Sequence, residues 1–188
     1  MKLIETPIAD LFIVEPSVFK DSRGYFFESY NAEKFLSLGL NVQFLQDNES
    51  CSDFGVIRGL HFQLAPFAQT KLVRVVQGKI LDVAVDIRKN SPTYGKHFTC
   101  VLSEENKQML YIPKGFAHGF SVLSPKAIVN YKCDCIYNAN AERGIRYNDP
   151  NLNIDWNLTN LEPIVSAKDN VLPLFVDIET NFVYGGNY

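Results

Sequence analysis

KILDVAVDI, residues 79–87, is the stretch that decides the fold class, because its apolar side chains alternate with polar or small ones. The apolar positions are Leu81, Val83, Val85 and Ile87. A period of two places every second side chain on the same face of a β-strand. The remaining positions, which share the opposite face, are Asp82, Ala84 and Asp86. The stretch therefore predicts a strand with one apolar face.

Four further runs with strand character follow along the chain. They are FTCVL at 98–102, QMLYI at 108–112, GFSVL at 119–123 and AIVNYKCDCI at 127–136. The segments between them, KNSPTYG, SEEN, PKG and LSPK, are rich in the residues that favour turns. Many short strands joined by turns predict a mainly β fold, either an antiparallel sandwich or a barrel.

Helical signals are few. NAEKFLSLG at 31–39 predicts one short helix, which Asn31 can cap and Gly39 can end. The tail from SAKDNVLPLF, residues 166–175, predicts a short helix and a last strand. With 188 residues and no linker or internal repeat, the whole chain 1–188 is expected to form one domain.

Charge and hydropathy exclude several classes of partner. The chain carries 18 Lys and Arg against 21 Asp and Glu, for a formal net charge of -3, so no basic surface for nucleic acid is expected. No apolar run approaches the length of a membrane span. The N-terminal MKLIETPIADLF is interrupted before it reaches the apolar length of a signal peptide, which favours a cytoplasmic protein.

The cysteines predict no zinc site and no disulfide framework. Their positions are Cys51, Cys100, Cys133 and Cys135. No C-x-x-C pair occurs, and four cysteines in a chain of this length are too few for a disulfide scaffold. Buried free thiols are the simplest interpretation.

VIRGLHFQ, residues 56–63, places a cation and an imidazole in a strand-like run. Strict alternation would point Arg58 and His61 to opposite faces. Gly59 lies between them, and a glycine inside a strand often marks a bulge. A bulge there would turn both polar side chains toward one cavity. Taken alone, however, a single histidine is more often an ordinary hydrogen-bonded residue than a catalyst.

YIPKGFAHGF, residues 111–120, contains P-x-G-x-x-H at Pro113, Gly115 and His118. This spacing matches the second half of the signature of the cupins, small β barrels with a central pocket. Metal-binding cupins add an H-x-H pair, where this chain has His61 followed by Phe and Gln. The third histidine, His97, lies in a polar turn. No metal site is therefore expected, and His61 remains free for proton transfer.

Tyr131 is a third candidate. In IVNYKCDCI it shares a strand face with Val129, Cys133 and Cys135, so it is expected to face the packed interior. Most such tyrosines bury a ring and satisfy the hydroxyl locally. A functional role would require a partner across a cavity.

Several motifs occur in order from about residue 20 to residue 170. They are DSRGYFFESY, QDN, IRGLHFQ, KLVRVVQGKILDVAVDIRKNSPTYG, IPKGFAHGF, YKC, ERGIRYNDP and IDW. Together they resemble the dTDP-4-dehydrorhamnose 3,5-epimerase family. The resemblance implies a mainly β, cupin-type jelly-roll barrel with a few short helices.

The resemblance also implies a reaction without a cofactor. The family converts dTDP-4-dehydro-6-deoxy-D-glucose to dTDP-4-dehydro-L-rhamnose, and the 4-keto group acidifies the protons on carbons 3 and 5. The family's base corresponds to His61, the carboxylate that orients it to Asp169, and the cation on the enolate oxygen to Lys71. Tyr131 corresponds to the acid that returns the proton on the opposite face.

The binding residues follow from the same resemblance. Sugar, diphosphate and nucleotide contacts correspond to Arg23, Glu28, Gln46, Asn48, Arg58, His118, Glu142 and Lys168. Tyr137 falls where an aromatic ring stacks on the thymine. The resemblance further implies a homodimer that exchanges N-terminal strands, with Arg23 serving the neighbouring pocket. The product would feed a glycan such as the O-antigen of lipopolysaccharide.

Four alternatives stay open from the sequence. A relative could epimerise one carbon only, and a ketoisomerase in the same barrel would move the keto group between carbons. A silent cupin would bind a sugar nucleotide or regulate transcription without proton exchange. A metal-dependent cupin oxygenase would require an iron site.

Overall fold

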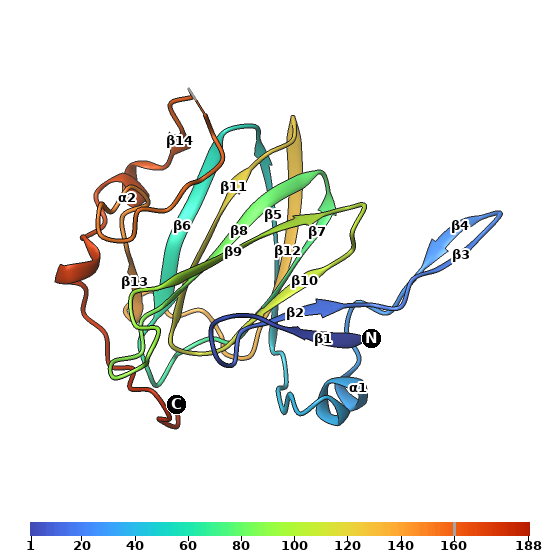
Figure 1. Cartoon of the computed structure of the whole chain (residues 1–188), viewed down its shortest axis with the longest axis horizontal. Coiled ribbons are helices and arrows are strands. Elements are labelled where there is room, and N and C mark those ends of the chain that lie inside the picture. The colour runs from blue at the N-terminus through green and yellow to red at the C-terminus, as the bar shows by residue number, and fades with distance from the viewer. Residues whose placement is uncertain (160) are drawn as a thin grey trace.

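Two β-sheets that lie face to face form the body of the molecule in the computed structural model, which describes residues 1–159 and 161–188 (Figure 1). In the first sheet the strand order is β1-β2-β10-β7-β12-β5. Its strands are β1 Lys2–Glu5, β2 Phe12–Glu15, β10 Met109–Ile112, β7 Lys71–Gln77, β12 Lys126–Cys133 and β5 Gln46–Asp53. All neighbours in this sheet run antiparallel.

The second sheet has the order β13-β6-β11-β8-β9. Its strands are β13 Glu142–Gly144, β6 Val56–Gln63, β11 Phe116–Val122, β8 Lys79–Asp86 and β9 His97–Ser103. These neighbours are antiparallel, and the short β14 Ile164–Val165 adds a parallel pairing to β6. The prediction of an antiparallel β sandwich or barrel is thus confirmed, including the five strand runs recognised in the sequence.

The remaining elements lie outside the two sheets. A hairpin of β3 Phe19–Asp21 and β4 Gly24–Phe26 projects away from the body (Figure 1). The predicted helix is confirmed as α1 Ala32–Ser37, and the side chain of Asn31 accepts a hydrogen bond from the Lys34 N–H at its start. Gly39 follows the helix with a φ of 85°, a conformation that favours glycine.

The C-terminal tail was predicted correctly only in part. The expected short helix forms as α2 Ala167–Asn170, capped by Ser166, and a 3₁₀ turn, η1, spans Phe175–Asp177. The expected last strand was wrong: beyond η1 the described residues form one isolated bridge, between Lys89 and Val183. The tail instead packs apolar side chains such as Phe182 against the outer face of the second sheet.

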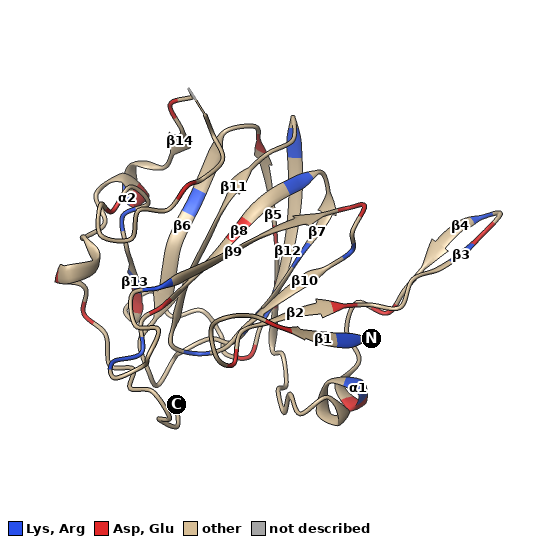
Figure 2. Ribbon diagram, viewed as in Figure 1, with Lys and Arg blue, Asp and Glu red and all other residues tan. Residues whose placement is uncertain are grey.

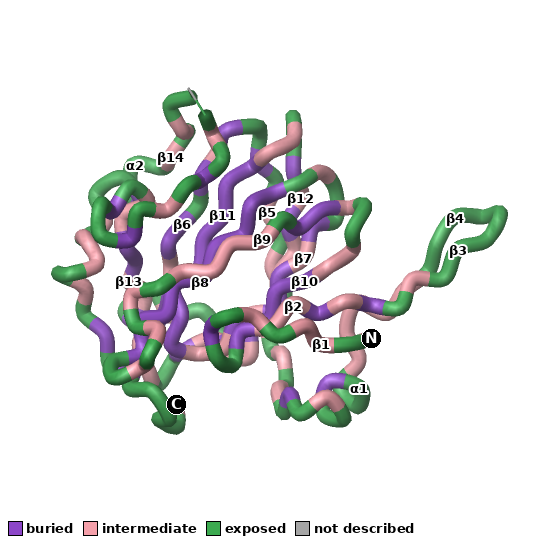
Figure 3. The backbone as a smooth tube through the Cα atoms, in the orientation of Figure 1, coloured by how far each residue is buried: buried purple, intermediate pink, exposed green. Residues whose placement is uncertain are grey.

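The core sits between the sheets and continues behind the second one, so that β8 is buried on both faces (Figure 3). The prediction that β8 has only one apolar face was therefore incomplete. Ile80 and Ala84 belong to the core between the sheets, whereas Leu81 and Val83 belong to the core behind the second sheet. Asp82, which alternation placed on the polar face, is fully buried.

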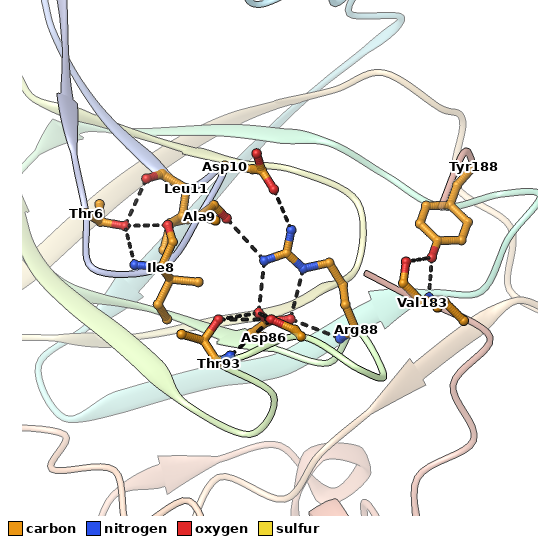
Figure 4. A network of polar contacts seen from close by, with 11 residues as sticks. Thr6, Ile8, Ala9, Asp10, Leu11, Asp86, Arg88, Thr93, Val183 and Tyr188 are labelled. Atoms are coloured by element: carbon orange, nitrogen blue, oxygen red, sulfur yellow. Dashed lines mark hydrogen bonds and ion pairs between the residues drawn. The ribbon is translucent and has the colours of Figure 1, made fainter. Parts of the chain in front are cut away.

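Asp86 at the end of β8 is also fully buried, and a network of polar contacts satisfies it (Figure 4). Arg88 contacts both carboxylate oxygens of Asp86, and its Nη1 donates to Oδ2 of Asp10 at 2.7 Å. Burial pushes the pKa of Asp86 up, but hydrogen bonds from Arg88, Ser91 and Thr93 outweigh it and hold the pKa below its ordinary value. The network ties the β1–β2 loop to the second sheet.

The cysteines depart from the expectation of burial. All four are free, but Cys133 alone is buried, while Cys100 and Cys135 are half-buried and Cys51 is exposed. Cys51 lies on the edge strand β5, on the face turned away from the facing sheet, which explains its exposure. Cys135 lies beyond the end of β12 and so is not part of the strand face that was predicted for it.

Charged residues are dispersed over strands and loops along the ribbon, and Figure 2 shows both signs interspersed. Among the helices of the described residues, none is long and apolar enough to cross a membrane.

Candidate active site

A cavity of about 550 Å³ opens beside β6 and β14, and it gathers the predicted catalytic residues. Those residues are His61, Lys71, Tyr131 and Asp169. They come from β6, β7, β12 and α2, so both sheets and the tail contribute. Arg58, His118 and Lys168 line the same cavity. The structure thus places side chains from distant parts of the sequence around one space.

A bulge in β6 brings Arg58 and His61 to the same cavity, as the position of Gly59 predicted. His61 lies opposite His118, and Arg58 lies opposite Phe120. Between these two pairs β6 contains one residue more than β11, which defines the bulge. Gly59 itself has a φ of 117°, which an L side chain rarely adopts. The prediction that the side chains of this strand depart from strict alternation is confirmed.

His61 and Asp169 form a close pair. Nε2 of His61 lies 2.7 Å from Oδ1 of Asp169, and the N–H of Gly59 donates to the other carboxylate oxygen at 3.2 Å. Burial pushes the pKa of Asp169 up, yet the hydrogen bond and charge of His61 and the Gly59 N–H hold it below its ordinary value. The ionised carboxylate therefore orients the imidazole and leaves its second ring nitrogen available.

Ser166 explains why Asp169 lies where it does. Its hydroxyl accepts a hydrogen bond from the Asp169 N–H at 3.0 Å and so begins α2. Directly before it, β14 pairs with the start of β6. The short helix is thereby held next to the bulge, and the carboxylate reaches a histidine 108 residues earlier in the chain.

Lys71 and Tyr131 face each other from adjacent strands of the first sheet, with the Lys71 Nζ 5.9 Å from the Tyr131 ring centroid. Burial lowers the pKa of Lys71, while the nearby Cys133, Asp82 and Glu142 partly offset this effect. Burial is also the main cause that raises the pKa of Tyr131. The phenol therefore keeps its proton near neutrality and can donate it.

A smaller cavity of about 90 Å³ continues from this region past Gln46, Asn48, Tyr137 and Glu142. Gln46 donates to the Asn48 side chain at 2.9 Å and accepts from the Tyr137 N–H at 2.8 Å. Glu142 Oε2 accepts from the Tyr137 hydroxyl and from Lys168 Nζ, each at 2.6 Å. These contacts fix the exposed Tyr137 ring at the mouth, where a planar base could stack on it.

Arg58 is held from the edge of the first sheet. Its Nε donates to the Ser52 hydroxyl at 2.9 Å, although the residue itself is exposed. The rest of the guanidinium keeps donors for an anionic group, and Arg suits diphosphate because its planar fork donates two hydrogen bonds at once.

Two predicted binding residues do not reach the cavity within this chain. Arg23 lies on the β3–β4 hairpin and pairs with Asp21 at 2.6 Å. Glu28 contacts Lys34 and Asn31 beside α1. Neither Arg23 nor Glu28 lines the main cavity or the smaller one. The projection of the hairpin accounts for the separation of Arg23, whereas Glu28 is held beside α1.

Asp82 contacts a residue of the site, and the sequence did not predict this contact. Its Oδ1 lies 2.7 Å from Nε2 of His118. Alternation alone assigned Asp82 to a polar face, and that pattern cannot distinguish a solvated face from the interior of a sandwich. The signal that could have found it is a carboxylate in the middle of an apolar strand, which is rarely buried without a partner.

Among the described residues, no group of three or more His, Cys, Asp or Glu side chains has the arrangement of a metal site. The donors that the cavity does offer, two histidines each bound to its own carboxylate, suit proton transfer and hydrogen bonding.

A histidine–carboxylate pair, a half-buried lysine and a protonated phenol around one cavity of a β sandwich define an acid–base catalyst of the cupin class. The sequence model of the family described as dTDP-4-dehydrorhamnose 3,5-epimerase matches residues 5–177. The chain belongs to this family, and it is an isomerase with the family's cupin fold.

Individual relatives agree with this assignment. The dTDP-4-dehydrorhamnose 3,5-epimerase of Shigella flexneri is 52% identical over 180 residues, which are 95% of this chain and 98% of that protein. A 3,5-epimerase from Legionella pneumophila in complex with dTDP-4-keto-L-rhamnose is 46% identical with a TM-score of 0.90, covering 95% of this chain and 94% of that one. A 3'-monoepimerase from Streptomyces bikiniensis in complex with dTDP-quinovose is 29% identical with a TM-score of 0.86, covering 94% and 88%.

Proposed function

We propose that this chain converts dTDP-4-dehydro-6-deoxy-D-glucose to dTDP-4-dehydro-L-rhamnose by inverting carbons 3 and 5 through enolates. The observation that carries the proposal is the convergence of the His61–Asp169 pair, Lys71 and Tyr131 on one cavity. The proposal agrees with the names of the relatives in the same family.

Each role follows from the position of the group. His61, oriented by Asp169, takes a proton from the carbon next to the keto group, because the resulting enolate spreads the charge onto oxygen. Lys71 stabilises that enolate oxygen with its positive charge. Tyr131, which burial keeps protonated, then returns a proton from the opposite face. No electron transfer is needed, because each step only moves a proton.

Binding roles are proposed for the remaining residues. Arg58 and Lys168 suit the diphosphate, and Tyr137 suits the thymine ring. Gln46, Asn48 and Glu142 frame the nucleotide end of the site. His118 lines the main cavity and suits the sugar. Arg23 and Glu28 are assigned to a composite site that is completed by a second subunit.

Proton NMR in deuterated water tests the reaction. The purified protein is mixed with dTDP-4-dehydro-6-deoxy-D-glucose, and the product is reduced to identify its configuration. We expect deuterium at carbons 3 and 5 and the L-rhamnose configuration. His61→Ala should lower turnover by about 10²- to 10⁴-fold, since a positioned base is lost. Near-normal turnover in H61A would contradict the assignment of the base.

The same spectra separate the alternatives. Label at one carbon only would indicate a single-centre epimerase, a class to which the Streptomyces bikiniensis relative belongs by name. Movement of the keto group would indicate a ketoisomerase, and binding without any label would indicate a silent cupin. Tyr131→Phe removes the phenolic proton while keeping the ring. We expect it to leave proton abstraction by His61 measurable but to block the inversion.

The setting of the enzyme is also a proposal. We propose that residues 1–188 act as one cupin-like epimerase domain, that two chains form a homodimer with exchanged N-terminal strands, and that the enzyme works in the cytoplasm. A deoxysugar made there would supply a surface glycan such as the O-antigen of lipopolysaccharide. A light-scattering mass equal to one chain would contradict the homodimer.

A further inference from the structure

A second histidine–carboxylate pair lies beside the catalytic one and is more deeply buried. Nε2 of His118 is 2.7 Å from Oδ1 of Asp82, and Asp82 is fully buried while His118 is 7% exposed. His118 on β11 lies directly opposite His61 on β6. Two histidines, each bound to its own carboxylate, therefore border the same cavity from neighbouring strands.

The other oxygen of Asp82 is buried and has no hydrogen-bond partner among the described residues. A buried carboxylate with an unpaired oxygen is costly unless a positive charge lies nearby. Burial lowers the pKa of Lys71 on the facing strand β7, and the negative charge of Asp82 is one of the effects that oppose this lowering. Asp82 thus interacts with two groups of the site at once.

The other neighbours of Asp82 do not explain why a carboxylate is buried at this position. Cys100 lies opposite it on β9, and burial followed by the charge of Asp82 raises the pKa of that thiol, which keeps it neutral. Ile80 and Ala84 flank Asp82 on the same face of β8 and belong to the apolar core. An apolar residue would suit this core at least as well, so packing gives no reason for a carboxylate.

We propose that Asp82 is a positioning residue of the active site, which fixes the orientation and tautomer of His118. An ionised carboxylate only accepts hydrogen bonds, so Nε2 of His118 must carry a proton. Nδ1 is then the nitrogen available to the sugar in the cavity. The inference rests on the proposed role of His118 in that site.

Asp82→Asn tests the inference because it keeps the size of the side chain and removes the charge. An amide can donate to Nε2 and so favour the wrong tautomer of His118. We expect kcat to fall about 10- to 100-fold, whereas the affinity for dTDP alone, which binds at the Tyr137 end, stays within about twofold.

Asp86→Asn is the matched control. Asp86 is equally buried on the same strand and the same face, but it contacts Arg88 rather than the site. We expect D86N to lower the Tm and leave kcat within about twofold of wild type. In a His118→Ala background, D82N should cause little further loss of kcat, because Asp82 acts through His118.

Nitrogen-15 NMR of the imidazoles gives a readout that does not depend on turnover. In the wild-type protein we expect a proton on Nε2 of His118, and in D82N we expect it on Nδ1. An unprotonated Nε2 in wild type, or a D82N enzyme with unchanged kcat, would overturn the inference. If D82N does not fold, the tautomer of His118 in the wild-type protein still tests the inference. Absence of proton exchange at the sugar in wild type would instead refute the proposed function, while the tautomer would still test Asp82.

Discussion

Lys71 shows how one residue of the site can weaken the fold that carries it. Its pKa is lowered from 10.5 because burial disfavours the charged ammonium. In the unfolded chain the ammonium is solvated, so between the lowered pKa and 10.5 the unfolded state binds more protons than the folded one. The free energy of unfolding should therefore rise with pH through this window.

Replacing Lys71 by Met removes this cost and the catalytic charge together. We expect K71M to raise the free energy of unfolding by about 1 kcal/mol at pH 7. This gain should shrink as the pH approaches the pKa of a free lysine side chain. Turnover should fall about 10²- to 10³-fold, since one oxyanion donor is lost. Denaturant unfolding at several pH values, together with kinetics, measures both effects.

Lys126→Met is a suitable control, because Lys126 is an exposed lysine on β12. It should change the free energy of unfolding by less than about 0.5 kcal/mol at every pH. A K71M protein that is less stable than wild type at pH 7 would show that the contacts of Lys71 outweigh the cost of burying its charge.

At the scale of the element, the bulge of β6 depends on Gly59. A Cβ there would lie 2.6 Å from the Cα of Gly119 and 2.7 Å from the carbonyl oxygen of His118, and backbone atoms cannot move aside cheaply. The same glycine donates its N–H to Asp169. A side chain at this position would thus push β6 away from β11 and disturb the His61–Asp169 pair.

Gly59→Ala and Gly55→Ala form a matched pair. Gly55 also has a positive φ, of 82°, but an added Cβ there meets nothing within 4 Å. We expect G55A to cost about 1 kcal/mol of stability and to keep its activity, since only the conformational penalty applies. G59A should cost about 3 kcal/mol or more and lose most of its turnover. Equal effects in the two variants would show that the close approach is unimportant.

Elements also explain what the sequence could predict. The strands, α1 and the bulge were accessible because alternation, capping residues and an internal glycine act locally. Asp169 could be placed beside His61 only by family resemblance, since 108 residues separate them. Asp82 was missed because a period of two does not reveal that the second face of a strand is also covered. Arg23 matched a motif, but its element projects away from the cavity.

At the scale of the whole molecule, the β3–β4 hairpin makes too few contacts with the rest of its own chain to be stabilised by them. Phe19 and Phe26 are 65% and 66% exposed, and the hairpin extends away from the body (Figure 1). An isolated two-stranded hairpin is marginally stable in water. A second chain that covers these rings would stabilise it and would bring Arg23 to the pocket of that chain, which is the arrangement proposed above for the homodimer.

Complementation between two inactive variants tests this arrangement. H61A destroys its own pocket but keeps Arg23, whereas R23A keeps its pocket but supplies no guanidinium to the other subunit. If Arg23 acts across the dimer, refolding the two variants together should restore about a quarter of wild-type activity, because about half of the dimers are mixed and each has one intact site. If Arg23 acts within its own chain, neither pocket of the mixed dimer is complete and activity stays at the level of the separate variants. Light scattering of the mixture verifies that dimers have formed, so the absence of recovery in a dimeric sample would refute the exchange of Arg23.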